Sequence, residues 1–309
     1  MIASLFRKST PLNYSLVIIA VIIFFFLYHI RHVTTNDTWL HIGTKWVQLG
    51  IIFASLFTTN FIVKKNGLSK DSAYTVLFYL VFMLFFPSVW DNGPLLISNF
   101  FILLSLRRLV SLYSLKATKE KIFDASLWVF IATLFHFWSI LFIILVFISI
   151  LFHAARDYRN WFLPFIAFFG VAVIFFLSAI IFHKPWIGSL KHEAVANFNM
   201  GYFTNNYQNV ALSGYATIGL FFIVSLLLTL SNRPLILHAS YKKIISAFFI
   251  AITVFAISPQ KSNDLLLYSF APLSIMATSH IEMAQVKWQK EVVLYGVMLI
   301  GFFCFFSQL

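Results

Sequence analysis

The chain has 309 residues, of which 61% are hydrophobic and only 10% are charged, and its mean hydropathy is +0.89. A soluble domain carries about 25% charged residues, so this composition excludes a soluble globular protein. Apolar runs close to the roughly 20 residues needed to cross a bilayer recur along the sequence. The composition therefore predicts an all-α protein, a polytopic bundle of transmembrane helices that forms a single integral membrane domain over residues 1–309.

Charge and cysteine content narrow the class further. The net charge of +12 follows the expected membrane topology, so it predicts no nucleic-acid partner. The single cysteine, Cys304, lies in the last apolar run, which leaves no disulfide and no cysteine-based metal site. The first apolar run lacks a small-residue cleavage site, and we expect it to remain as a helix rather than to be removed as a signal peptide.

Eleven membrane spans are predicted in chain order. They lie at about 12–28, 44–63, 72–90, 95 to the pair Arg107-Arg108, 122–135, 137–152, 161–182, 215–231, 244–258, 265–280 and 292–306. The fifth is too short to cross a bilayer upright. Such a half-span is tolerated where it lines a cavity or packs on other helices.

Lysine and arginine are distributed unevenly between the two sides of this topology. With the N-terminus inside, 17 of the 22 basic residues fall on the inner side. The remaining five are Arg31, Lys45, Lys184, Lys191 and Lys261. Because short inner loops are enriched in Lys and Arg, this asymmetry predicts a multi-pass protein of the inner membrane with a cytoplasmic N-terminus and an outer C-terminus.

The outer connections collect acidic residues and histidines. These are Asp37, Asp91, Glu193 and Asp264, together with His29, His32, His41, His136, His183 and His192. An ionisable group costs about 2.5–3.5 kcal/mol at the bilayer centre and less near the interface, and such groups usually face a cavity. The pattern therefore predicts a functional site on the outer side.

Asp37, in the connection after the first span, is the predicted catalytic residue. A carboxylate beside Arg31 and several imidazoles could accept a proton from an alcohol. The alternative is that Asn36-Asp37-Thr38 caps a short helix, and one residue can do both. The spacing of the nearby histidines matches no compact metal motif, so no metal is predicted.

Seven further residues are predicted to bind substrate: Arg31, His32, His41, Asp91, His136, Lys261 and Asp264. Lys261 could hold a phosphate oxyanion as a point charge, whereas the alternative for Lys261 and Asp264 is a solvated loop. His136 lies between two short spans, where irregular backbone would line a cavity. Asp91 opens a turn by composition.

The outer connection 183–214 divides into two parts. Apolar residues recur at helical spacing from Trp186 to Phe198, opposite Lys191 and Glu193, which predicts a helix lying in the membrane interface. The following stretch, 197–209, is rich in Asn and Tyr. Amide and aromatic side chains suit sugar hydroxyls and ring faces, but they also suit a turn-rich loop.

Several stretches resemble an uncharacterised family of polytopic membrane proteins from Bacteroidota, of flavobacterial type. These are Phe6-Arg-Lys-Ser-Thr-Pro-Leu-Asn13, Leu104-Ser-Leu-Arg-Arg-Leu, Lys121-Ile-Phe-Asp-Ala-Ser-Leu-Trp, Leu-Phe-His-Phe-Trp138 and Arg159-Asn-Trp-Phe-Leu-Pro164. The resemblance covers most of the chain and implies no particular activity.

The layout also resembles membrane glycosyltransferases of the GT-C class, which use polyprenyl-phosphate sugars. In that class an acidic residue of the first outer loop is commonly the catalytic base or a group that orients the acceptor, and Asp37 occupies that place. The resemblance implies a glycosyltransferase-like protein of the cell envelope that handles a lipid-linked sugar at the outer leaflet. The chain departs from the class because it has no acidic pair at Asp37 and no large soluble domain.

Other functions remain open at this point. The main alternative is a non-enzymatic transporter, flippase or scaffold subunit of an envelope complex, with membrane lipid and membrane-protein subunits as partners. Few ionisable residues lie within the spans, which disfavours a proton-coupled pump. A third possibility, a polysaccharide polymerase, would need a basic outer cavity, and the presence of only five outer Lys and Arg residues disfavours it. The sequence has no Walker A, G-x-G-x-x-G, H-E-x-x-H or G-x-S-x-G pattern, so it indicates no particular cofactor.

Overall fold

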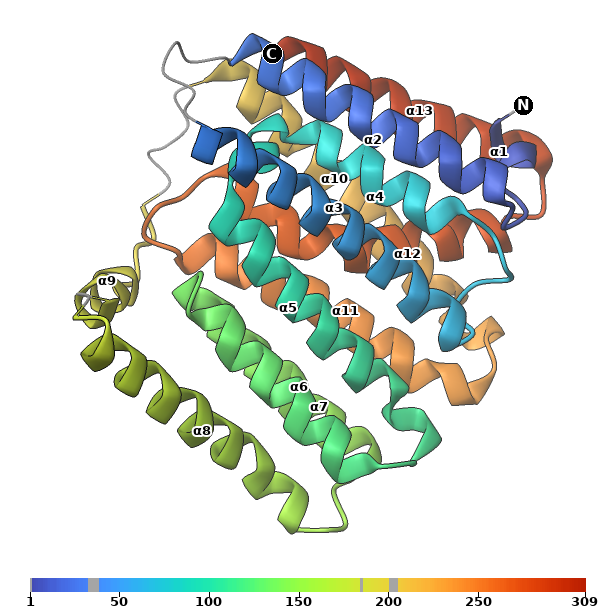
Figure 1. Ribbon diagram of the computed structural model, residues 1–309. Coiled ribbons are helices and arrows are strands. Elements are labelled where there is room, and N and C mark those ends of the chain that lie inside the picture. The colour runs from blue at the N-terminus through green and yellow to red at the C-terminus, as the bar shows by residue number, and fades with distance from the viewer. Residues whose placement is uncertain (1, 33–38, 184–185, 200–204) are drawn as a thin grey trace. The chain divides into compact units, whose positions relative to one another are not determined.

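The computed structural model describes residues 2–32, 39–183, 186–199 and 205–309, and every secondary-structure element in these ranges is a helix (Figure 1). Seven helices of this part of the chain are long and apolar enough to cross a membrane. They are Pro11–Arg31, Ile42–Lys65, Gly93–Ser114, Arg159–Ile181, Asn206–Asn232, Leu235–Ile257 and Lys287–Ser307. Tyr74–Phe85 and Phe137–His153 are shorter apolar helices. The protein is thus an all-helical membrane protein.

Each of the eleven predicted ranges overlaps an α-helix, but two helices begin nine residues earlier than predicted. Helix α10 spans Asn206–Thr229 and α11 spans Leu235–Ile257, whereas starts at 215 and 244 were predicted. The connection predicted over 183–214 is therefore shorter than expected, because its last nine residues belong to α10. The side chain of Asn205 accepts a hydrogen bond from Tyr207 N at 2.9 Å, which starts α10 within polar sequence.

The helix predicted over 186–198 is shorter than expected. It is α9, Trp186–Glu193. Beyond it, Asn197 N donates to Ile257 O at 2.9 Å, so the chain at 197 pairs with the end of α11 instead of continuing its own helix.

The helices form two compact units. Unit 1 comprises residues 1–96, 203–234 and 270–309, and unit 2 comprises residues 97–202 and 235–269. Besides α10, unit 1 holds α1 (Ile2–Leu5), α2 (Pro11–Arg31), α3 (Trp39–Lys65), α4 (Tyr74–Phe85), η1 (Pro87–Asp91), η4 (Leu230–Asn232), most of α12 (Leu267–Met283) and α13 (Lys287–Ser307). Besides α9 and α11, unit 2 holds most of α5 (Gly93–Val110), η2 (Ser111–Ser114), α6 (Thr118–Thr133), η3 (Phe137–Phe142), α7 (Ile143–His153), α8 (Arg159–Ile181) and η5 (Asn263–Leu266).

Unit 1 is built around α4. All 12 residues of this helix are buried, as expected for a helix that is apolar on every face. Helices α2, α3, α10 and α13 pack against it. The ring of Tyr215 on α10 lies 5.3 Å from Phe86 and 5.7 Å from Phe270, centroid to centroid, so aromatic rings from three segments fill the core.

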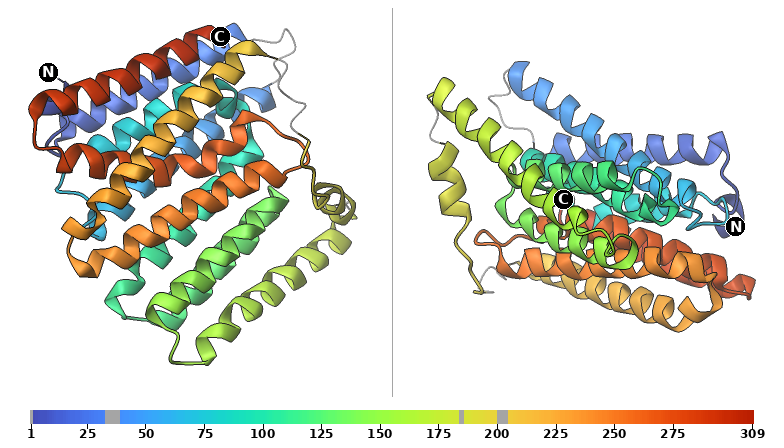
Figure 2. Two further views of the ribbon diagram at one scale, coloured as in Figure 1. Left: turned by 180° about the vertical axis from the view of Figure 1, so that it is seen from behind. Right: turned by 90° about the horizontal axis from the view of Figure 1, so that it is seen from below.

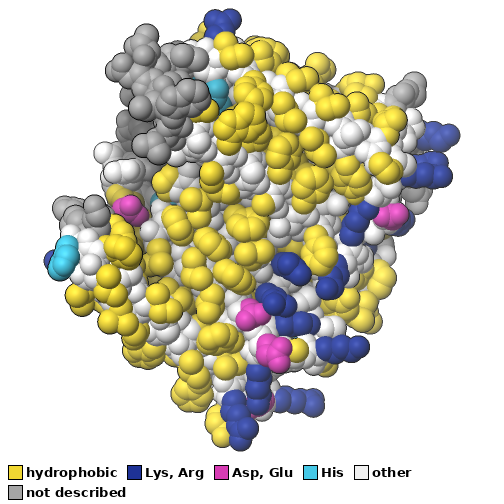
Figure 3. Space-filling model, viewed as in Figure 1, with side chains coloured by type: hydrophobic (Ala, Val, Ile, Leu, Met, Phe, Trp, Pro, Cys, Tyr) yellow, Lys and Arg dark blue, Asp and Glu magenta, His cyan; other side chains and the backbone are white. Residues whose placement is uncertain are grey.

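In unit 2, α6 packs along α8, and α7 contacts α6, α8 and α11 (Figures 1 and 2). Only 17% of the most apolar stretch of α8 is buried, and Phe169, Ile174 and Ile180 are each more than half exposed. In water such a face would drive aggregation. In a bilayer it contacts acyl chains, in keeping with the hydrophobic surface that Figure 3 shows.

One end of the unit 2 helices is rich in lysine and arginine (Figure 3). Here α5 and α7 end and α6, α8 and α11 begin. The ion pair Arg108–Asp124 is 2.8 Å long. The buried Lys243 donates from Nζ to Leu109 O at 2.6 Å, so a lysine amine satisfies one of the last carbonyls of α5. We call this region the basic end of unit 2.

Candidate functional site

His136 and Ser258 form a pair at the other end of the unit 2 helices, in which Ser258 is buried and His136 is half-buried. His136 follows α6 and precedes η3, and Ser258 follows α11. His136 Nε2 lies 3.2 Å from Ser258 Oγ. Because the Ser258 hydroxyl donates to Val254 O at 2.7 Å, its oxygen must accept from His136. This assigns the proton of a neutral His136 to Nε2.

Burial determines the charge of His136. Removal of the imidazole from water lowers its pKa from 6.5 to about 4, because burial disfavours the charged form. His136 is therefore neutral at pH 7, where it donates a hydrogen bond but carries no charge.

The pH dependence of stability follows from this shift. The unfolded chain binds a proton at His136 below about pH 6.5, whereas the folded chain does so only near pH 4. The contribution of His136 to stability is thus complete above pH 6.5 and is lost as the pH falls from there to about 4. We expect thermal unfolding of the detergent-solubilised protein to show a shallower loss of stability over this window in His136→Asn than in the wild type. If the stability of the two proteins fell equally steeply with pH over this window, the lowered pKa of His136 would be contradicted.

Asn197 connects the segment after α9 to the chain after α11. In addition to its backbone bond to Ile257, its Nδ2 donates to Pro259 O at 3.4 Å, and its carbonyl oxygen accepts from Lys261 Nζ. Glu193, four positions earlier, accepts from Phe137 N through Oε2 at 3.3 Å. The segment 193–197 is therefore bonded to both neighbouring connections.

These contacts define the His136 cluster, which consists of His136, Glu193, Asn197, Ser258 and Lys261. It combines a carboxylate, a neutral imidazole, a hydroxyl, an amide and a lysine amine within one unit. A carboxylate can accept a proton from a hydroxyl, and a lysine can stabilise a phosphate oxyanion. The cluster therefore has the groups needed to bind a phosphate ester and to deprotonate an alcohol.

A smaller polar group lies in unit 1, between α2 and the last residue of η1. His29 Nε2 is 3.7 Å from Asp91 Oδ1, and the backbone oxygen of Asp91 accepts from Gln48 Nε2 at 3.0 Å. The Asp91 side chain is 52% exposed. His32 is bonded through Nδ1 to Tyr28 O at 2.9 Å, and its ring stacks on Tyr28.

The predicted site residues are distributed over both units. Asp37 lies outside the described residues, as does the side chain of His41. Arg31, His32 and Asp91 belong to unit 1, and His136, Lys261 and Asp264 belong to unit 2. Arg31 is exposed at the end of α2, while Asp264 is buried in η5. That all of them meet in one pocket stays a prediction.

Ser258 was missed by the sequence analysis, and Asn197 was considered only on the polar face of the predicted interfacial helix and in an Asn-rich stretch. Ser258 comes immediately before Pro259, where an apolar run ends, and nothing in that pattern pairs it with His136. Among the residues that the structure describes, no three His, Cys, Asp or Glu side chains are grouped as a metal site.

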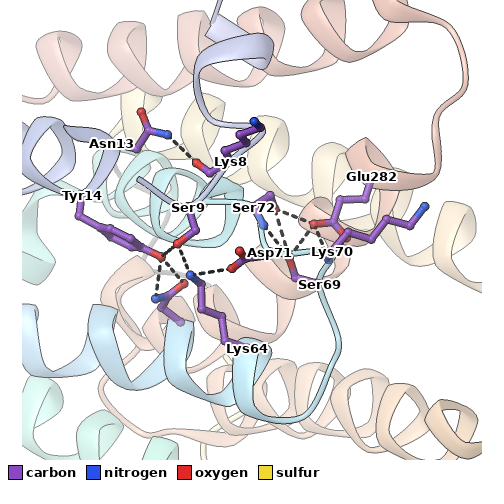
Figure 4. Close-up of polar contacts among 11 residues, drawn as sticks. Lys8, Ser9, Asn13, Tyr14, Lys64, Ser69, Lys70, Asp71, Ser72 and Glu282 are labelled. Atoms are coloured by element: carbon purple, nitrogen blue, oxygen red, sulfur yellow. Dashed lines mark hydrogen bonds and ion pairs between the residues drawn. The ribbon is translucent and has the colours of Figure 1, made fainter. Parts of the chain in front are cut away.

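A second polar cluster joins the N-terminal segment, the α3–α4 connection and the end of α12 in unit 1 (Figure 4). Glu282 accepts from Ser69 Oγ and Ser72 Oγ, both at 2.6 Å, and from Lys70 N at 3.0 Å. Lys64, in the last turn of α3, pairs with Asp71 of the same connection at 3.0 Å. The Glu282 carboxylate thus satisfies donors of a tight turn, which indicates a structural role.

Glu282→Gln is expected to destabilise the protein by about 2 kcal/mol, since hydrogen bonds to a charged acceptor contribute about 1.5–3 kcal/mol. The measurement is unfolding of the detergent-solubilised protein. Lys70→Gln serves as the control because Lys70 contacts Glu282 through its backbone nitrogen. Equal stability of the Glu282 and Lys70 variants would show that the carboxylate contributes nothing.

Comparison with known proteins gives one family and no individual relative. No curated protein and no solved structure matches this sequence. A family of unknown function, DUF6427, matches residues 5–309 and so covers nearly the whole chain. This agrees with the expectation of an uncharacterised family, and the chain belongs to DUF6427.

Proposed function

We propose that this protein is a multi-pass inner-membrane transferase of the cell envelope, which moves a sugar from a polyprenyl-phosphate carrier to an acceptor hydroxyl at the outer leaflet. The observation that carries the proposal is the His136 cluster, which holds the carboxylate of Glu193 and the amine of Lys261 on hydrogen-bonded segments of one unit. The likeness of the sequence layout to the GT-C class adds the expectation of a lipid-linked donor.

The proposed topology has eleven spans, a cytoplasmic N-terminus, an outer C-terminus and α9 in the outer interface. Support comes from the separation of charge within unit 2. Arg108, Lys119, Lys121 and Lys243 lie at the basic end, and the His136 cluster lies at the other end of the same helices. Basic residues remain preferentially in the cytoplasm, so the basic end is assigned to the inside.

The proposed reaction is a displacement at the anomeric carbon. The acceptor oxygen forms a bond to that carbon, the bond between carbon and phosphate oxygen breaks, and polyprenyl phosphate leaves with the electron pair. Lys261 stabilises the phosphate charge that develops. The acceptor proton passes to a carboxylate, for which Glu193 is the candidate in the described cluster and Asp37 is the candidate from the sequence.

The test uses the full-length protein in liposomes with a radiolabelled polyprenyl-phosphate hexose and an extract of envelope acceptors. We expect polyprenyl lipid to co-purify with the protein and label to leave the donor. Glu193→Gln and Asp37→Asn are compared in the same assay, because loss of a general base lowers turnover by about 10²–10⁴-fold. Unchanged turnover in one variant removes that residue from the role of base.

The main alternative is a non-enzymatic subunit, supported by the Phe-rich face of α8, which is suited to a protein partner as well as to lipid. Stable co-isolation with other membrane subunits, without donor turnover and without bound polyprenyl lipid, would favour this alternative and contradict the transferase proposal.

A further inference from the structure

An open cavity of about 600 Å³ lies at the basic end of unit 2, where α7 ends, α8 begins and α6 starts beside them. The turn that forms it is held by Asn160, whose Nδ2 donates to Ala154 O at 2.9 Å. The small side chains of Ala154 and Ala155 are part of the lining. The cavity is large enough for a small polar ligand.

The lining carries an excess of positive charge. Lys119 Nζ pairs with Asp157 Oδ2 at 3.2 Å. The hydrogen bond from Arg159 N, followed by the contact with Lys119, lowers the pKa of Asp157, so its carboxylate is ionised at neutral pH. Arg156 also lines the cavity, and no acidic side chain of the described residues pairs with it. Once Lys119 and Asp157 neutralise each other, the guanidinium of Arg156 remains to bind an anion.

A buried hydrogen-bond acceptor in the lining sets a second requirement for the ligand of this cavity. Asn160 is only 4% exposed and lines the cavity, yet its Oδ1 has no hydrogen-bond partner in the described part of the chain. Buried polar atoms are nearly always hydrogen-bonded, so this oxygen calls for an external donor. The ligand should therefore carry both a negative charge and a hydroxyl or ammonium group.

The rim of the cavity is apolar. Leu115, Leu151 and Phe152 are part of the lining and are 62%, 58% and 45% exposed. A ligand that fills the cavity with its polar end would thus continue into hydrocarbon, which distinguishes a lipid from a soluble phosphate.

We propose that this cavity binds a glycerophospholipid, with its phosphate on Arg156 and a hydroxyl or ammonium group of its head on Asn160 Oδ1. Phosphatidylethanolamine and phosphatidylglycerol carry such donors, whereas the choline head of phosphatidylcholine has none. Basic pockets between helix ends are known to suit lipid head groups. This site is at the other end of the unit 2 helices from the His136 cluster, and it does not depend on the transferase proposal.

The experiment measures thermal unfolding of the purified full-length protein in micelles, because a ligand that binds the folded state stabilises it in proportion to its occupancy. The additions are phosphatidylethanolamine, phosphatidylglycerol, phosphatidylcholine, soluble glycerophosphoethanolamine and inorganic phosphate. We expect saturable stabilisation by the first two lipids and about tenfold weaker binding of phosphatidylcholine. Stabilisation by inorganic phosphate or glycerophosphoethanolamine equal to that by the lipids would overturn the lipid assignment.

Arg156→Gln is the test variant, and Arg159→Gln is its matched control, because Arg159 is an exposed arginine of the same segment that is not part of the lining. We expect Arg156→Gln to weaken lipid binding about tenfold and Arg159→Gln to change it little. Equal effects would indicate non-specific attraction and overturn the proposal. Ala155→Leu, which fills the cavity without altering charge, should also weaken binding, and unchanged affinity would exclude occupancy of this cavity.

Discussion

Lys261→Met is expected to lower donor turnover in the liposome assay by about 10²–10³-fold, the loss that follows removal of one group that stabilises transition-state charge. Lys261 lies in the connection that also carries Ser258. Its ammonium group donates a hydrogen bond to the backbone carbonyl oxygen of Asn197. The departing phosphate gains negative charge as the bond to the sugar breaks. Methionine retains much of the length of the side chain but removes that charge. The measurement is the initial rate of label release from the polyprenyl-phosphate hexose.

Two controls separate chemistry from folding. Lys191→Met removes a lysine from the exposed surface of α9, in the same region of the chain, and should leave turnover unchanged. Lys261→Arg retains the positive charge and should recover part of the rate. The unfolding temperature of each variant shows whether loss of the bond to Asn197 has disturbed the fold. Normal turnover in a correctly folded Lys261→Met protein would remove Lys261 from the proposed mechanism.

The helices could be predicted from the sequence because hydropathy reports how much apolar surface must avoid water. Hydropathy does not report what that surface contacts in the folded protein. Helix α4 is buried on every side, whereas most of α8 is exposed, although both are continuous apolar runs. Whether a run contacts protein or lipid depends on tertiary packing. The same limit explains why the stretches with polar residues near the start of α10 and α11 were assigned to connections.

The candidate site was predicted only in part. His136 and Lys261 could be selected because an ionisable residue next to an apolar span is costly unless it is solvated or bonded. Ser258 and Asn197 give no such signal, since a serine or asparagine is ordinary at the end of a helix or in a turn. Their place in the His136 cluster comes from the pairing of 193–197 with 257–261, a contact between distant parts of the chain.

Gly301→Leu is expected to destabilise unit 1 by about 3 kcal/mol, at the upper end of the usual cost of overpacking. Gly301 lies on α13 where that helix packs against α4. A Cβ atom at this position would be 3.0 Å from Val81 Cγ1 and 3.3 Å from Val81 O. The backbone oxygen cannot rotate away, so accommodation requires the two helices to separate. Loss of their close contact weakens the packing that buries α4.

Gly296→Leu is the matched control. Gly296 lies on the same helix, and a Cβ atom there would meet nothing within 4 Å. Both substitutions gain helix propensity, by about 0.5–1 kcal/mol relative to glycine, so the difference between them isolates the steric term. The measurement is the midpoint of denaturant unfolding in detergent. A Gly301 variant as stable as the Gly296 variant would show that α4 and α13 do not approach as closely as the structure places them, and the packing of unit 1 would have to be reassigned.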